Sequence, residues 1–159
     1  MCDNPHHAPV AQWIEHLPPE QGVASSILAR RIYFQISPRH LMVIINRIDA
    51  SIIKTRHGSE IRPLIDRTTS SIQQCSLAEE VLPVGAVIGR HHHLLTEEIY
   101  YILRGEGLMT VGDETSEVVS GDAVFIPRGQ MHALENTGSE PLTMMLVCGP
   151  AHSFDDHHE

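Results

Sequence analysis

The chain has 159 residues, with 11 Lys and Arg against 20 Asp and Glu, which gives a formal net charge of −9 at neutral pH. This length is sufficient for one domain with a hydrophobic core, and the acidic balance argues against nucleic acids or anionic membranes as partners. No apolar run approaches the ~20 residues of a membrane span, and no signal-peptide pattern opens the sequence.

Residues 1–41 differ in character from the rest of the chain. They contain the single Trp and a Pro18-Pro19 pair, which would end any helical turn begun at residues 12–16, and they lack strand-like alternation. Residues 10–29 also resemble a transfer-RNA gene translated in a protein reading frame. We therefore interpret residues 1–41 as a non-native leader from a misplaced gene start, with the real protein beginning near Met42. The alternative is a genuine disordered or capping extension.

From Met42 onward, short apolar runs alternate with turn residues such as Gly112-Asp113 and Gly121-Asp122. This pattern is typical of an all-β sandwich or jelly roll. We expect strands at residues 43–45, 51–53, 72–82, 87–95, 98–103, 107–111, 117–119, 123–126, 131–135 and 142–148. The predicted domain covers residues 42–150.

Residues 151–159 form an acidic tail that contains His152, His157 and His158. We expect a mobile, solvated end here rather than a second metal site. The three cysteines are Cys2, Cys75 and Cys148, and their spacing suggests no disulfide framework, so we expect a reducing, cytoplasmic location. Cys75 and Cys148 lie in apolar runs, and we interpret both as small core residues rather than catalytic thiols.

Four residues between positions 85 and 136 have the types that a metal site requires: His91, His93, Glu98 and His132. Side chains alternate faces along a strand, so His91 and His93 point the same way and His92 points to the opposite side. If the strand that begins at Glu98 pairs with the histidine strand, a turn at residues 94–97 brings Glu98 beside the two imidazoles. His132 then arrives from a later strand. Three imidazoles and a carboxylate suit a divalent ion such as zinc, iron, manganese or nickel.

The alternative is that these histidines are ordinary surface or core residues, and we prefer the metal site because several ligand-type residues share one face. Glu97 could replace Glu98 as the ligand. Tyr100 shares the inward face with Glu98, and we expect it in the core, with a possible hydrogen bond to a molecule near the metal. We expect Asn136 to stabilise a turn at a strand end.

These residues belong to two motifs that resemble those of the cupin superfamily, G-x5-H-x-H-x4-E-x6-G and G-x5-P-x-G-x2-H-x3-N. Every fixed position is present, at Gly85, His91, His93, Glu98 and Gly105 and then at Gly121, Pro127, Gly129, His132 and Asn136. The similarity extends from about residue 58 to residue 150. The sequences of residues 97–103 and 121–127 resemble those of the sugar-isomerase-like branch. The resemblance implies a double-stranded β-helix, or jelly-roll barrel, with a divalent metal held by His91, His93, Glu98 and His132.

The resemblance does not fix a substrate, because function depends on the site and not on the fold. Our first hypothesis is metal-assisted isomerisation or epimerisation of a small oxygen-rich molecule, such as a sugar, sugar phosphate or hydroxy acid. The alternatives are an iron- or manganese-dependent dioxygenase and a non-catalytic binding or sensor module. The sequence names no catalytic base. We also expect a homodimer, because residues 42–53 supply apolar side chains beyond the needs of one small barrel.

Overall fold

The computed structural model describes residues 42–159. The predictions for residues 1–41 lie outside this range. Within it, the chain forms strands β1 (Ile53–Lys54), β2 (Glu60–Ile65), β3 (Ser76–Leu82), β4 (Val87–His91), β5 (Glu97–Arg104), β6 (Glu106–Val111), β7 (Glu114–Val119), β8 (Ala123–Ile126), β9 (His132–Glu135) and β10 (Leu142–Gly149). Two short 3-10 helices, η2 (Arg47–Asp49) and η3 (Phe154–Asp156), flank the strands. None of the helices between residues 42 and 159 is long and apolar enough to cross a membrane.

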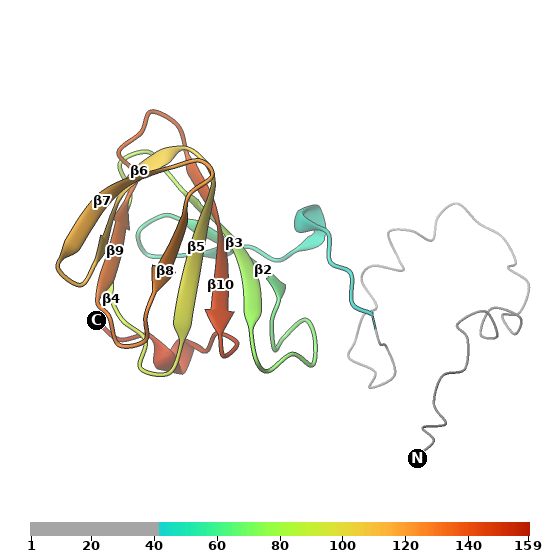
Figure 1. Ribbon diagram of the computed structural model, residues 1–159. Helices are drawn as coiled ribbons and strands as arrows, with labels where there is room; N and C mark the ends of the chain where they lie inside the picture. The colour runs from blue at the N-terminus through green and yellow to red at the C-terminus, as the bar shows by residue number, and fades with distance from the viewer. Residues whose placement is uncertain (1–41) are drawn as a thin grey trace, which may run out of the picture. The chain divides into compact units, whose positions relative to one another are not determined.

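The strands form two antiparallel sheets. The larger sheet has the order β1-β2-β3-β10-β5-β8, and the smaller has the order β4-β9-β6-β7. In Figure 1 the smaller sheet lies on the left and the larger on the right. Sequence neighbours such as β4 and β5 lie in different sheets, which is how a jelly roll wraps its strands. The predicted all-β jelly roll is therefore confirmed.

The core lies between the sheets and follows the alternation of strand side chains. In β5, Glu98, Tyr100 and Ile102 are buried, while the residues between them are exposed. Leu82, Leu134, Leu142 and Met144 are completely buried around Ile102. Burying such a side chain stabilises the fold by about 1.5–3 kcal/mol. One end of β5 thus builds apolar core, and the other end places a carboxylate in the same interior.

Some predicted strands are wrong. Residues 43–45 form no strand, and Ile44 is 74% exposed because this segment lies outside both sheets. β2 was not predicted, because it contains Pro63, which cannot donate a ladder hydrogen bond. Its pairing with β3 shifts register between Pro63 and Ile65. Cys75 was expected in the core but is exposed just before β3.

Candidate metal centre

Four buried side chains, His91, His93, Glu98 and His132, converge at one end of the sheet pair. His91 is the last residue of β4, Glu98 is the second residue of β5, and His132 is the first residue of β9. His93 lies in the turn that leaves β4. One ligand atom from each residue lies within 4.8 Å of the other three. The structure therefore brings together all four residues predicted from the sequence.

The route by which they meet differs from the prediction. β4 does not pair with β5. Instead β4 pairs with β9, with His91 opposite His132, and β5 pairs with β10 and β8. The turn after His93 carries the chain across to the opposite sheet, so Glu98 faces the histidines across the interior.

Backbone carbonyls fix the orientation of the three imidazoles. The Nδ1 atoms of His91, His93 and His132 lie 2.9, 2.6 and 3.0 Å from the carbonyl oxygens of Gly89, Asp156 and Gln130, respectively. A carbonyl oxygen can only accept, so each Nδ1 carries the hydrogen and donates it. In the neutral ring, each Nε2 then presents a lone pair, which is the arrangement that metal-binding histidines adopt.

The interior of the cage consequently lacks hydrogen-bond donors. Glu98 Oε2 lies 3.2 Å from His132 Nε2 and 3.4 Å from His93 Nε2. Both Glu98 Oε2 and His132 Nε2 are buried without a hydrogen-bond partner. Acceptors that face one another in a buried space are costly unless a cation lies between them. The residues present therefore fit a divalent metal ion.

The pKa values of the cage residues fit the binding of positive charge. Burial works against ionisation of Glu98, but the neighbouring His132 and His93 imidazoles outweigh it and hold the carboxyl pKa well below its usual range. Burial and the neighbouring His132 lower the pKa of His91 to about 3, so this imidazole stays neutral and keeps its lone pair. Burial opposes protonation of His93 too, but Glu98 outweighs it and raises that pKa. A metal ion therefore competes with a proton for Nε2 of His93.

Residues 78–148 match the Cupin domain family. A protein of Methanocaldococcus jannaschii is 42% identical over 102 residues, which cover 64% of this chain and 82% of that protein. The chain belongs to the cupin family. An oxalate-binding protein of Thermotoga maritima is 39% identical over 66 residues, 42% of this chain and 54% of that protein. The crystal structure of a predicted oxalate decarboxylase from the same organism superimposes with a TM-score of 0.60 at 29% identity, over 69% of this chain and 99% of that one.

Cys148 of this cupin contacts the carboxylate of Glu98. Its Sγ–H donates to Glu98 Oε1 at 3.1 Å, since the two residues are register partners on β10 and β5. Burial, followed by the charge of Glu98, raises the pKa of the thiol, so it remains a donor and not a nucleophile. The predicted burial of Cys148 is confirmed. Its contact with Glu98 was missed, because the sequence did not reveal that β10 pairs with β5.

The structure also places the other candidates around the cupin cage. Glu97 is exposed, so Glu98 is the residue in the cage. Tyr100 is buried with its ring centroid 6.0 Å from that of His132, and burial followed by the negative charges nearby raises its pKa well above the usual value. Its hydroxyl therefore stays protonated. His92 lies outside the cage and pairs through its backbone with His158.

Asn136 has the structural role predicted for it. Its side-chain amide donates to the carbonyls of Leu82 and Glu140, each at 2.9 Å, and its oxygen accepts from Gly138 N at 3.0 Å. These bonds tie the end of β9 to its neighbours. Both amide hydrogens of Asn136 are therefore used in holding this strand end.

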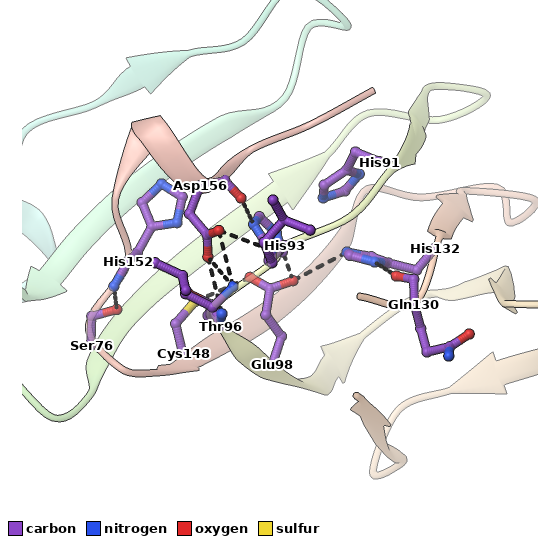
Figure 2. A network of polar contacts seen from close by, with 12 residues as sticks. Ser76, His91, His93, Thr96, Glu98, Gln130, His132, Cys148, His152 and Asp156 are labelled. Atoms are coloured by element: carbon purple, nitrogen blue, oxygen red, sulfur yellow. Dashed lines mark hydrogen bonds and ion pairs between the residues drawn. The ribbon is translucent and has the colours of Figure 1, made fainter. Parts of the chain in front are cut away.

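The expectation of a solvated tail was wrong. Asp156 is buried, and its carbonyl receives the hydrogen bond from His93, as Figure 2 shows. The ring of His157 stacks on that of His91, with centroids 4.4 Å apart and an interplanar angle of 18°. His152 lies 6.2 Å from His93, measured between ring centroids. The composition of this segment predicted a solvated tail, because the residues that it contacts lie far away in the sequence.

Proposed function

We propose that this cupin binds a divalent metal ion through His91, His93, Glu98 and His132, and that the centre binds a small oxygen-rich anion. The observation that carries the proposal is the donor-free cage, in which three Nε2 lone pairs and a carboxylate oxygen face one another. Four protein ligands leave room for one or two further oxygen atoms around a five- or six-coordinate ion.

The charge of the cage favours an anion as the ligand. Glu98 is the only charged group among the four ligand residues, so a divalent ion leaves a net positive centre. When bound, the metal supplies Lewis acidity and open positions for ligand oxygens. A hydroxy acid or a dicarboxylate can bind through two adjacent oxygens. The similarity to an oxalate-binding protein supports a carboxylate ligand.

A cavity near the cage offers space for a small molecule. Its volume is about 450 Å³, and its lining includes Val111 and Val124. None of the four cage residues lines this cavity, but Val111 is the strand partner of His132, and Val124 is the strand partner of Tyr100. This volume lies in the lower part of the range for small-molecule sites.

Isomerisation or epimerisation stays a prediction, and so does the assignment to the sugar-isomerase-like branch. Such a reaction requires a base that removes a proton next to the metal-bound oxygens. His157 is the candidate that the structure offers, because it stacks on His91 and its side chain is 41% exposed. Burial, followed by the nearby His93 and His152, lowers its pKa, so a neutral imidazole is available to accept a proton.

The test starts from metal-free protein reloaded separately with zinc, iron, manganese or nickel. Calorimetric titration with oxalate and small hydroxy acids should show binding that requires the metal and vanishes in His132→Ala. Isomerisation of aldose and ketose panels, abolished in His157→Gln at unchanged metal content, would establish the isomerase. Oxygen uptake by the iron form would establish the dioxygenase instead. Metal-dependent binding without turnover would establish a binding module. Absence of stoichiometric metal binding would refute the proposal.

We also propose a homodimer in the cytoplasm. The outer face of β5 and β8 exposes Ile99, Tyr101, Leu103 and Phe125, which supports pairing of two copies in addition to the apolar residues 42–53. Cys75 and Cys148 are free, which supports a reducing compartment. Light scattering at micromolar concentration tests the dimer, and a strictly monomeric mass would refute it.

A further inference from the structure

One residue outside the cupin motifs, Asp156, binds the loop that connects two of the cage ligands. Its carboxylate accepts hydrogen bonds from the backbone N–H groups of Leu94, Leu95 and Thr96 at 2.9, 3.1 and 3.0 Å. Asp156 is 5% exposed, and these bonds lower the pKa of its carboxyl despite the opposing effect of burial. These three N–H groups point toward one carboxylate because the turn at residues 94–96 wraps around it.

The same residue contacts a ligand directly. His93 Nδ1–H donates to the backbone carbonyl of Asp156 at 2.6 Å, and Figure 2 shows this contact next to those from the carboxylate to the turn. His93 precedes the turn and Glu98 follows it. Asp156 therefore fixes the tautomer and tilt of one ligand, and also fixes the backbone that sets its distance from the next.

The rest of the segment 152–158 is anchored on both sides of Asp156. His152 N donates to Ser76 Oγ at 3.0 Å. His158 and His92 exchange two backbone hydrogen bonds, at 2.8 and 3.0 Å. Hydrogen bonds at both ends and at the centre therefore hold the segment 152–158 next to the cage.

We propose that Asp156 is a positioning residue of the metal centre and that the segment 152–158 is an integral wall of it. This inference rests on the proposed metal binding. Partners that orient a metal-bound histidine typically change metal affinity by about 10- to 100-fold when they are removed. The affinity of this site is therefore built from two parts of the chain, the cupin motifs and a segment that follows the barrel.

The experiment compares Asp156→Ala and Asp156→Asn with the matched control Asp155→Ala. Asp155 is the exposed neighbour in the same 3-10 helix, and its backbone N–H donates to Ser153 Oγ within the segment itself. The dissociation constant for zinc is measured by competition with a chromophoric chelator, and the melting temperature of each metal-free protein is measured in parallel. We expect Asp156→Ala to weaken zinc binding by about 10- to 100-fold and Asp155→Ala to leave it unchanged. Asp156→Asn keeps the size of the side chain and one acceptor oxygen, so it should fold and bind zinc with an intermediate loss.

A second readout separates positioning from a purely structural role. In metal-free protein, ¹⁵N NMR of the imidazoles should show His93 with a protonated Nδ1 in the wild type and in Asp155→Ala. The backbone carbonyl that accepts from His93 remains in the Asp156 variants, but its segment is no longer tied to the turn at residues 94–96 by the carboxylate, so we expect these variants to weaken the preference. A lower melting temperature with unchanged zinc affinity and unchanged His93 tautomer would mean that Asp156 serves only stability, which overturns the inference. Failure of the wild-type protein to bind zinc or any other divalent ion would instead refute the proposed function.

Discussion

Replacing His93 by Ala, with His92→Ala as its matched control, tests the metal centre most directly. The two residues are adjacent in sequence, but His93 is 4% exposed inside the cage and His92 lies outside it. Loss of an outer partner of a ligand costs about 10- to 100-fold in affinity. Loss of an inner ligand should therefore cost at least about 100-fold.

This loss can be read as thermal stability. A metal at about 100 times its dissociation constant stabilises the folded state by about 2.7 kcal/mol, which raises Tm by roughly 10 °C in a domain of this size. A 100-fold weaker site at the same concentration gains only about 0.4 kcal/mol, or roughly 2 °C. We therefore expect the metal-induced rise in Tm to be nearly abolished in His93→Ala and retained in His92→Ala.

The assay is differential scanning calorimetry of metal-free protein with and without added metal, together with elemental analysis of the purified variants. The metal-free Tm of each variant provides the baseline, so a general loss of stability does not count as loss of metal. Equal metal loss in the two variants would refute the assignment of His93 and His92 to opposite faces of their strand, from which the cage was predicted.

Four further outcomes are expected. Glu98→Gln should retain weak metal binding, since its amide oxygen still coordinates without charge, and elemental analysis should find partial occupancy. Gly107→Ala should lower Tm by roughly 5–15 °C, because the new Cβ would lie 2.5 Å from a backbone oxygen of β9; Gly89→Ala, with open space around its Cβ, should change Tm far less. Asp66→Ala should cost about 1 kcal/mol, since the carboxylate accepts hydrogen bonds from the next turn. These bonds lower the pKa of Asp66 against the opposing effect of burial. The extra free energy of unfolding of the wild type over Asp66→Ala, measured in urea, should therefore be complete above the pKa that Asp66 has in the unfolded chain. It should be lost as the pH falls through the pKa that Asp66 has in the folded protein. Deletion of residues 1–41 should leave zinc affinity unchanged, because all four ligands follow them in the chain; a weaker site in the truncated protein would contradict the interpretation of a leader.

The local sequence predicted most of the strands and the four residues that meet in the cage. Alternation along a strand is a property of the backbone, so it separated His93 from His92 and placed Glu98 on the face of Tyr100 without knowledge of the sheets. Glycines and proline at strand ends likewise act within a few residues. For the same reason β2 was not predicted, because Pro63 disfavours a strand locally and the pairing with β3 maintains it.

The tertiary structure alone decided which strands are neighbours and what surrounds the ligands. The route considered from the sequence depended on pairing of β4 with β5, but these strands lie in opposite sheets, so the cage residues meet across the interior and not along one sheet. Cys148 reaches Glu98, and Asp156 reaches His93, across 50 and 63 residues of sequence. No local pattern encodes such contacts, because they depend on the packing of distant segments. The polar tail looks solvated in the sequence, but in the folded protein the buried carboxylate of Asp156 accepts hydrogen bonds from three backbone N–H groups of the turn at residues 94–96.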